Sequence, residues 1–497
     1  MNVLSGSIKK DKSVIWAFLV ILLYSAINIV VLSRHEPWED EAQAWLIARD
    51  LNIISIFKQM GYEGSPALWH MLLVPLAKSG LPYISESILH LVIAVAAVTV
   101  FILYAPFSKV TKVLFIFSYY MAYEYSIIAR NYNLTILLLF LIAALYAKRF
   151  QSPVKYSFLI FLLFNTNVHS FFIAFSLTLL FAWELHRNKI LAGLSRIAVF
   201  IMLTGGLLSS LQLLSPPDNM NYGIFGDDVY LHGVHYMAPF VAMANAFFPW
   251  HTLFIAPGMY IYAVVISFFI FCIVISTIVK KPPALFIFSV SFAGLFYIFA
   301  FKYVGFVRHH GFILILLIFS LWISRYYSNS EKEFLNRSFK INLSGISVVV
   351  INAFLALSLL CSLRFQYMDY RYKFSGAEEM ADFIKKNQLD AQIIIAHRSR
   401  KTCALLPYLP EKKFWYAGIE DYGTFITWNV KYLAGTRVSS SQVIRRAGRA
   451  FPDKSKILLL LTSPLDFPES DGFRLLYKVD EVFGYSKEKF YLYKSIS

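Results

Sequence analysis

About eleven apolar runs along the chain are long enough, or nearly so, to cross the roughly 30 Å of hydrocarbon in a lipid bilayer. No other feature constrains the fold as strongly, because backbone polar groups within a bilayer must be satisfied inside helices or a closed barrel. The length of the runs predicts helices. They cover Val14–Leu32, Ile84–Ala105, Val113–Ile128, Leu134–Tyr146, Tyr156–Val168, Phe171–Leu185, Ile190–Leu214, Leu253–Val279, Ala284–Phe301, Phe312–Ile323 and Ile341–Leu363.

The composition agrees with a polytopic α-helical membrane protein. Hydrophobic residues make up 58% of the 497 residues and charged residues 15%, whereas a soluble domain carries roughly 25% charged residues. A soluble enzyme, a disordered protein and a disulfide scaffold are therefore excluded. Cys272 and Cys361 lie in predicted spans and Cys403 in the tail, so we expect neither a disulfide framework nor a four-ligand zinc site. The net charge of +16 does not indicate a nucleic-acid partner, because membrane proteins concentrate Lys and Arg in their cytoplasmic loops.

The loop charges predict the orientation. Basic residues gather in alternate loops: Lys9, Lys10, Lys12, Lys109, Lys112, Lys148, Arg149, Lys155, Arg187, Lys189, Lys280, Lys281, Arg325, Lys332, Arg337 and Lys340. Acidic residues gather in the others: Glu36, Glu39, Asp40, Glu41, Asp50, Glu63, Asp218, Asp227 and Asp228. The positive-inside rule then predicts a multi-pass protein of the cell inner (plasma) membrane with a cytoplasmic N-terminus.

Two domains follow from the change in pattern along the chain. Residues 1–363 form the transmembrane domain, with a first outer loop over residues 33–83, and residues 364–497 form a small extracytoplasmic α/β domain. Within this tail, Ser375–Glu378 matches a capping box before a helix that runs to Lys386. A basic helix is predicted over Ser439–Phe451, and short strands over Gln392–Ala396, Lys413–Tyr416, Ile457–Leu461, Phe473–Tyr477 and Phe490–Tyr493.

The first outer loop holds the most informative stretch. Four carboxylates fall between Glu36 and Glu41, flanked by Trp38 and Trp45. From Asp40 onward the spacing suggests a helix on the bilayer surface, with acids at its N-terminus where the helix dipole stabilises their charge. One interpretation is a helix cap with solvated acids. The other is a partly desolvated carboxylate that acts as a base, since Trp and Tyr mark the membrane interface.

A second stretch runs from Tyr119 to Tyr132 and places Glu124 and Arg130 at the outer end of an apolar hairpin. Ionisable groups at membrane depth are costly and indicate function by default. The alternative is an ion pair between the two residues that holds the bend.

A third stretch, Lys302 to Gly311, carries Arg308 and His309 to the same outer face. These cations could hold an anion, because the Arg fork suits phosphate; the alternative is snorkelling at the interface. His169 lies at another outer bend, as a structural residue or as part of the site.

The order of these features resembles the GT-C superfamily of polytopic glycosyltransferases, which use polyprenyl-phosphate-linked sugars. The resemblance rests on the Asp40-Glu41 pair in the loop after the first helix, and on the acid and Arg-x-Tyr of a second outer loop, Glu124 and Arg130–Tyr132. The stretch Trp38–Trp45 is similar to the protein O-mannosyltransferase and lipid A aminoarabinose transferase branch, where a first-loop acid is the catalytic base. The protein mannosyltransferases carry β-trefoil inserts for which this chain has no room.

The resemblance implies an inverting hexosyl- or pentosyltransferase that moves a sugar from a polyprenyl-phosphate-linked donor to a lipid, glycan or protein acceptor of the envelope. It implies Asp40 as base and Glu41 as a positioning or second carboxylate. Membrane lipids are further partners. No metal ligand is predicted, and a need for a divalent cation stays open. The predicted substrate-binding residues are Glu124, Arg130, Tyr132, His169, Lys302, Arg308 and His309.

Two other classes of protein fit the same composition. The first is a transporter or flippase for a lipid-linked or anionic solute, and the second is a scaffold that recruits envelope enzymes. A transporter needs charges spaced through the bilayer and matching helices broken by Gly or Pro. Here the charges gather at the outer ends of the runs, which favours the enzyme.

Overall fold

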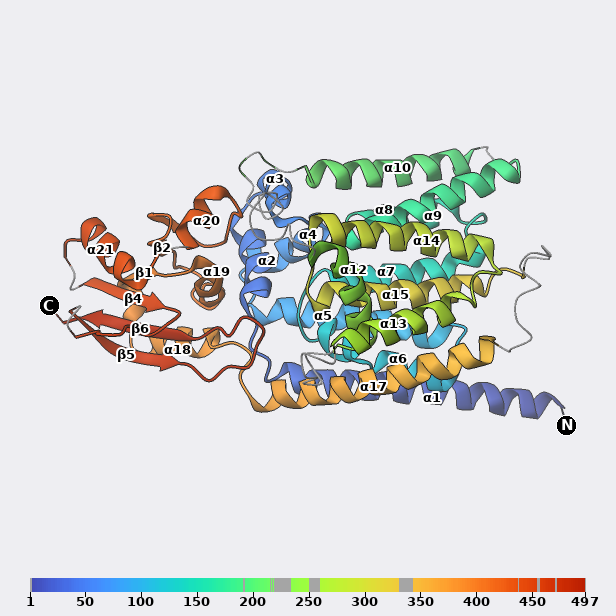
Figure 1. Cartoon of the computed structure of the whole chain (residues 1–497), viewed down its shortest axis with the longest axis horizontal. Helices are drawn as coiled ribbons and strands as arrows, with labels where there is room; N and C mark the ends of the chain where they lie inside the picture. Colours follow the sequence, from blue (N-terminus) through green and yellow to red (C-terminus); the bar gives the residue numbers. More distant parts are fainter. Residues whose placement is uncertain are drawn as a thin grey trace.

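The computed structural model describes residues 2–190, 193–214, 216, 218, 234–249, 260–329, 343–436, 438–453, 456–469 and 472–496. A long bundle of helices carries a smaller α/β domain at one end, and the N-terminus lies at the opposite end (Figure 1). The last apolar helix, α17 (Leu343–Arg371), runs past the predicted boundary at residue 363. We therefore call residues 372–497 the C-terminal domain.

Apolar side chains all around most of the helices explain the bundle, because such helices are stable only inside a core or in lipid. α15 is buried along nearly its whole length and forms the centre, whereas α1 and α10 expose large side chains such as Phe18 and Phe200. The bundle elements are α1 (Asn2–Leu32), α5 (Ile84–Tyr104), α6 (Lys109–Ile116), η1 (Tyr120–Glu124), α7 (Tyr132–Leu145), η2 (Tyr146–Lys148), α8 (Pro153–Phe164), α9 (Val168–Arg187), α10 (Leu194–Gln212), α12 (Val234–Phe247), α13 (Tyr260–Ile275), α14 (Pro282–Tyr297), η5 (Ile298–Lys302), α15 (Val307–Ser324) and α17.

Among the described residues, seven helical segments are long and apolar enough to cross a membrane, and five shorter apolar helices accompany them. The chain is therefore a polytopic helical protein, and the count of eleven spans stays a prediction. Parts of the predicted runs Ile190–Leu214, Leu253–Val279 and Ile341–Leu363 lie outside the described residues, as do the loop charges Asp227, Asp228, Lys332, Arg337 and Lys340.

The predicted run Val113–Ile128 is not one continuous helix. α6 ends at Ile116, the π-helical turn η1 follows at Tyr120–Glu124, and the chain then turns irregularly to Arg130. Irregular backbone at membrane depth is tolerated where protein buries it, and residues 118–129 are all buried. The break brings Glu124 and Arg130 to the end of the bundle that faces the C-terminal domain.

Three short helices of the loop after α1 lie between the bundle and the C-terminal domain (Figure 1). They are α2 (Glu39–Asp50), α3 (Ile53–Glu63) and α4 (Leu68–Lys78). α2 packs on α4 and carries the acid cluster. Nine of its twelve residues are buried, so it is a packed element under the C-terminal domain rather than a helix on an open surface.

A six-stranded sheet with the order β3-β2-β1-β4-β6-β5 forms the core of the C-terminal domain. β1 pairs in parallel with β2 and β4, and β6 runs antiparallel between β4 and β5; Ile394 lies opposite Leu458 in the β1–β4 register. The five predicted strands are confirmed and β3 was missed, because Asp421-Tyr-Gly423 lacks apolar alternation. The strands are β1 (Ile393–Ala396), β2 (Phe414–Tyr416), β3 (Asp421–Gly423), β4 (Ile457–Leu461), β5 (Phe473–Val479) and β6 (Phe490–Ser495).

Helices cover the sheet, and the predicted basic helix is confirmed as α21. The predicted capping box is wrong: Gly376 is the N-cap of α18, and the Ser375 hydroxyl donates to Glu488 Oε2 at 2.5 Å while accepting from Ala377 N at 3.1 Å. The helices of this domain are α18 (Ala377–Lys386), η6 (Leu389–Ala391), α19 (Ser399–Thr402), η7 (Cys403–Leu405), α20 (Val430–Thr436) and α21 (Ser440–Ala450).

Candidate active site

The N-terminus of α2 is built by the local sequence. Pro37 favours extended backbone before it, and Trp38 is the extended N-cap residue. The backbone N–H of Trp38 donates to Glu41 Oε2 at 3.1 Å, which closes one half of a capping box. Glu39, Asp40 and Glu41 all lie in the first turn, where the helix dipole favours negative charge.

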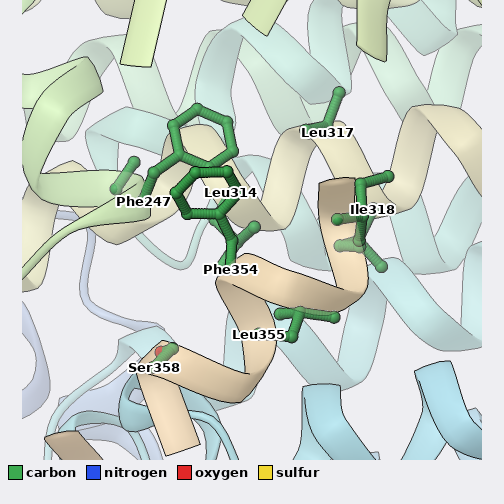
Figure 2. A pocket seen from close by; sticks show the side chains of 9 residues that line it. Phe247, Leu314, Leu317, Ile318, Phe354, Leu355 and Ser358 are labelled. Atoms are coloured by element: carbon green, nitrogen blue, oxygen red, sulfur yellow. The ribbon is translucent and has the colours of Figure 1, made fainter. Parts of the chain in front are cut away.

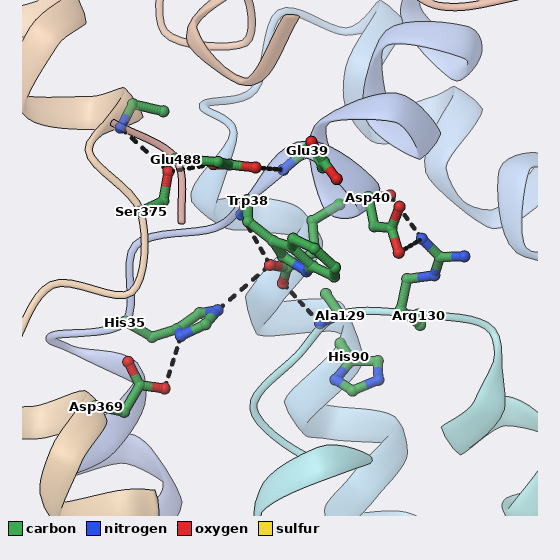
Figure 3. Close-up of polar contacts among 12 residues, drawn as sticks. His35, Trp38, Glu39, Asp40, His90, Ala129, Arg130, Asp369, Ser375 and Glu488 are labelled. Carbon is green, nitrogen blue, oxygen red and sulfur yellow. Dashed lines mark hydrogen bonds and ion pairs between the residues drawn. The ribbon is translucent and has the colours of Figure 1, made fainter. Parts of the chain in front are cut away.

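These three acids point to three different parts of the molecule, because consecutive helical residues are rotated by about 100°. Glu39 faces Glu488 of the C-terminal domain, and Asp40 faces Arg130 (Figure 3). Asp40 also pairs with Arg308, and Glu41 accepts a hydrogen bond from the Ala129 backbone N–H inside the bundle. One helical turn thus divides the acid cluster into three environments.

Asp40 is the centre of an ion-pair cluster. Its Oδ2 lies 3.0 Å from Arg130 Nη1 and 2.9 Å from Arg308 Nη2, and Arg130 Nη1 also donates to the Asp40 carbonyl oxygen at 3.1 Å. The Asp40 side chain stays 16% exposed. Burial alone would raise the pKa of Asp40, but the guanidinium groups of Arg130 and Arg308 outweigh it and hold the pKa below its usual range.

The Glu41 side chain, unlike that of Asp40, is closed off from solvent, since it is 1% exposed. Its Oε1 accepts from the Ala129 backbone N–H at 2.7 Å, and its Oε2 lies 3.3 Å from His35 Nε2. His35 Nδ1 in turn lies 2.8 Å from Asp369 Oδ2 on α17. Burial alone would lower the pKa of His35, but the two carboxylates raise it to about 10. Glu41 therefore belongs to a buried, charged link between α2 and α17.

Glu124 and Arg130 do not form the alternative ion pair: Arg130 pairs with Asp40, and buried Glu124 is held by two tyrosines. Its Oε2 accepts from Tyr119 at 2.7 Å and from Tyr485 of the C-terminal domain at 2.6 Å. The side chain thus joins the bundle to the C-terminal domain, beside the Asp40 cluster.

Aromatic and imidazole side chains surround the arginines. The Tyr132 hydroxyl lies 2.9 Å from His309 Nε2, and the His309 ring stacks on His169 with 5.1 Å between centroids. Both ring nitrogens of His169 are buried without a hydrogen-bond partner among the described residues. Lys302 is exposed at the end of η5, on the segment that leads to Arg308. The structure thus gathers most of the predicted residues and leaves Lys302 at the rim.

The C-terminal domain completes the site with residues that no sequence pattern predicts. Arg400 Nε lies 2.6 Å from Glu39 Oε1, and Glu488 Oε1 accepts from the Glu39 backbone N–H at 2.8 Å. Burial raises the pKa of both Glu39 and Glu488, more than Arg400 lowers that of Glu39. Contacts that span more than 300 residues leave no local signal, so no spacing argument could have found them. Trp38 was noted only as a neighbour, yet the Arg308 guanidinium lies 5.4 Å from its ring centroid.

The arrangement combines an ionised, partly exposed carboxylate with several guanidinium groups. It can take up a proton and bind an anion in the same place. Among the described residues, no three His, Cys, Asp or Glu side chains lie where they could share a metal ion. Compared with known proteins, the chain matches no family model and no curated protein.

Proposed function

We propose that the protein is a membrane glycosyltransferase. It moves a hexosyl or pentosyl group from a polyprenyl-phosphate-linked donor to an envelope acceptor, a lipid, glycan or protein, with inversion at the sugar carbon. The observation that carries this proposal is the cluster in which Asp40 Oδ2 contacts Arg130 at 3.0 Å and Arg308 at 2.9 Å, in a side chain that stays 16% exposed as a whole.

The cluster supplies both chemical needs of glycosyl transfer. A base must take the proton of the acceptor hydroxyl, and cations must hold the leaving phosphate. Asp40 is the base in this proposal, and Arg130 and Arg308 hold the phosphate. An incoming phosphate competes with Asp40 for the same guanidinium groups. As these ion pairs weaken, the pKa of Asp40 rises, so donor binding itself makes the carboxylate a better base.

The bundle offers an apolar region for the donor lipid. A pocket between α12, α15 and α17 is lined by apolar side chains (Figure 2), among them Phe247, Leu314 and Phe354. Its one hydroxyl, Ser358, accepts from the backbone N–H of Tyr119 at 3.0 Å. α15 begins beside the cluster with Arg308 and lines the pocket further along. The pocket is small, about 10 Å³, which is room for about one water molecule. In this proposal the donor tail therefore lies along the apolar outer faces of the helices rather than inside the pocket.

The proposed location is the outer face of the inner (plasma) membrane. The cluster lies at the end of the bundle that faces the C-terminal domain, and the N-terminus lies at the other end (Figure 1). Together with the basic loops, this supports a cytoplasmic N-terminus and an extracytoplasmic site.

The test is donor binding and turnover in Arg130→Ala and Arg308→Ala. Each removes a charge-assisted contact worth roughly 1.5–3 kcal/mol, so we expect at least about tenfold weaker use of the lipid-linked donor. Lys at either position should restore only part of it, because Lys lacks the planar fork. Arg325→Ala, which changes an exposed arginine at the other end of α15, is the control. Unchanged donor use in both alanine variants would exclude the site.

A further inference from the structure

We propose that Arg400, on the C-terminal domain, is a substrate-binding residue that holds a phosphate-type oxyanion at the solvent-exposed side of the Asp40 cluster. The inference rests on the proposed function and extends it, because it makes the C-terminal domain part of the active site. The anion comes from the donor phosphate or from an anionic lipid headgroup.

The geometry of Arg400 leaves most of its guanidinium available. Its Nε is engaged with Glu39 Oε1 at 2.6 Å. Among the described residues, no hydrogen bond to either Nη atom of Arg400 is found, and the side chain is 43% exposed. The guanidinium therefore presents its outer edge, the edge that binds phosphate in a bidentate fashion.

Arg400 is the most solvent-exposed of three arginines in this cluster. The side chain of Arg308 is 10% exposed, that of Arg130 25% and that of Arg400 43%. Three guanidinium groups thus run from the protein interior to the solvent around two carboxylates, Asp40 and Glu39. The ion pairs join these three guanidinium groups to two carboxylates, so Asp40 is shared by two arginines. Arg308 Nε is buried without a hydrogen-bond partner among the described residues. Guanidinium N–H groups that lack a partner in a partly buried place favour an anionic ligand.

Docking of the C-terminal domain does not depend on Arg400. The backbone N–H and C=O of Ile426 both bond to the Gln43 side chain, at 2.9 and 2.7 Å. Arg49 Nη1 donates to Leu406 O at 3.2 Å, and Glu488 accepts from the Glu39 backbone N–H. These contacts hold α2 against the domain whether or not Arg400 keeps its carboxylate partner.

The test measures binding to the full-length protein in phosphatidylcholine nanodiscs. Three probes are added separately: polyprenyl phosphate, polyprenol without phosphate, and phosphatidylglycerol. Arg400→Ala, Arg400→Lys and Glu39→Gln are compared with the wild type. The matched control is Arg474→Ala, an exposed arginine on strand β5. Arg130→Ala is measured in parallel as the probe of the proposed function.

We expect Arg400→Ala to weaken binding of a phosphate-bearing probe about tenfold, with polyprenol binding unchanged and partial recovery in Arg400→Lys. Loss with polyprenyl phosphate alone identifies the donor as the source of the anion, and loss with phosphatidylglycerol alone identifies a lipid headgroup. Glu39→Gln should bind as well as the wild type or more tightly, because it releases Arg400.

Two results would overturn the inference. Wild-type affinity of Arg400→Ala for both anionic probes shows that Arg400 binds no substrate. Equal losses in Arg400→Ala and Glu39→Gln show that the ion pair only holds the domain. In either case, if Arg130→Ala binds polyprenyl phosphate more weakly than the wild type, the proposed function is still supported. Unchanged binding in both Arg130→Ala and Arg400→Ala removes the proposed site and the inference together.

Discussion

At the scale of single residues, three consecutive acids have three different surroundings. Glu39 is neutralised in part by an arginine of another domain, Asp40 by two arginines of the bundle, and Glu41 by a buried histidine and backbone N–H groups. The direction in which each side chain leaves the helix therefore determines its chemistry more than its residue type does. Substitutions at these neighbouring positions should have different consequences.

Asp40→Asn keeps the shape of the side chain but cannot accept a proton. We expect turnover to fall about 10²–10⁴-fold, the usual contribution of a positioned general base. Donor binding should be kept or tightened, because Asn does not compete with the phosphate for the two arginines. The structure excludes a capping role for Asp40, since Trp38 is the N-cap, and full activity of the variant would exclude Asp40 as the base. Glu41→Gln should instead reduce stability, because Glu41 is buried in the link to His35. Transfer by purified protein is the measurement, and Asp50→Asn on the same helix is the control.

His35→Gln removes the positive partner of Asp369 and Glu41. Breaking a buried pair costs about 3–5 kcal/mol, so we expect a lower Tm near neutral pH. The pKa of His35 is raised from 6.5 to about 10, so its contribution is complete below about pH 6.5 and disappears as the pH rises through 10. The Tm difference between wild type and variant should therefore shrink toward pH 10. His186→Gln, at an exposed position of α9, should show no such trend, and a constant difference for His35→Gln would refute the charged link.

At the scale of elements, periodicity and apolar length predicted most helices and five of the six strands, because each is encoded by neighbouring residues. Val113–Ile128 failed because tertiary contacts decide its backbone: the Met121 carbonyl accepts from the Tyr24 hydroxyl at 2.6 Å, and the Ala122 carbonyl accepts from Gln366 Nε2 at 2.6 Å. Such bonds compensate a broken helix, and only the assembled bundle supplies them. The same limit explains why Asp40 and Arg130 were each predicted as site residues while the ion pair between them was not predicted.

The packing of α15 on η1 yields a prediction at this scale. Gly311 of α15 has no room for a side chain, because a Cβ atom there would overlap the Tyr120 ring and the Tyr125 hydroxyl. We expect Gly311→Ala to destabilise the protein by about 1–3 kcal/mol through overpacking. At Gly206 of α10 a Cβ atom would lie 3.5 Å from the Phe164 ring, an ordinary contact, so Gly206→Ala should be neutral or stabilising. Thermal unfolding in detergent compares them, and equal Tm values would contradict the close packing.

At the scale of the whole molecule, the candidate site lies where the bundle, the loop after α1 and the C-terminal domain meet. Sequence patterns predicted each of these parts and several of their charged residues. They could not predict that Glu39 meets Arg400, that Glu124 meets Tyr485, or that His35 meets Asp369, because these contacts depend on how the parts are assembled. The C-terminal domain is thus joined to the site by side chains as well as by the chain connection.

This assembly predicts that the N-terminus and the C-terminal domain lie on opposite sides of the membrane. The basic loops predict that the N-terminus and the end of α9 lie in the cytoplasm, and the C-terminal domain lies at the other end of the bundle (Figure 1). We expect an alkaline phosphatase reporter to be active when fused after Arg371 and inactive when fused after Arg187. A fluorescent reporter that folds only in the cytoplasm should give the reverse pattern. If the fluorescent reporter, rather than alkaline phosphatase, were active when fused after Arg371, the Asp40 cluster would lie on the cytoplasmic side. An extracytoplasmic acceptor could not reach it there.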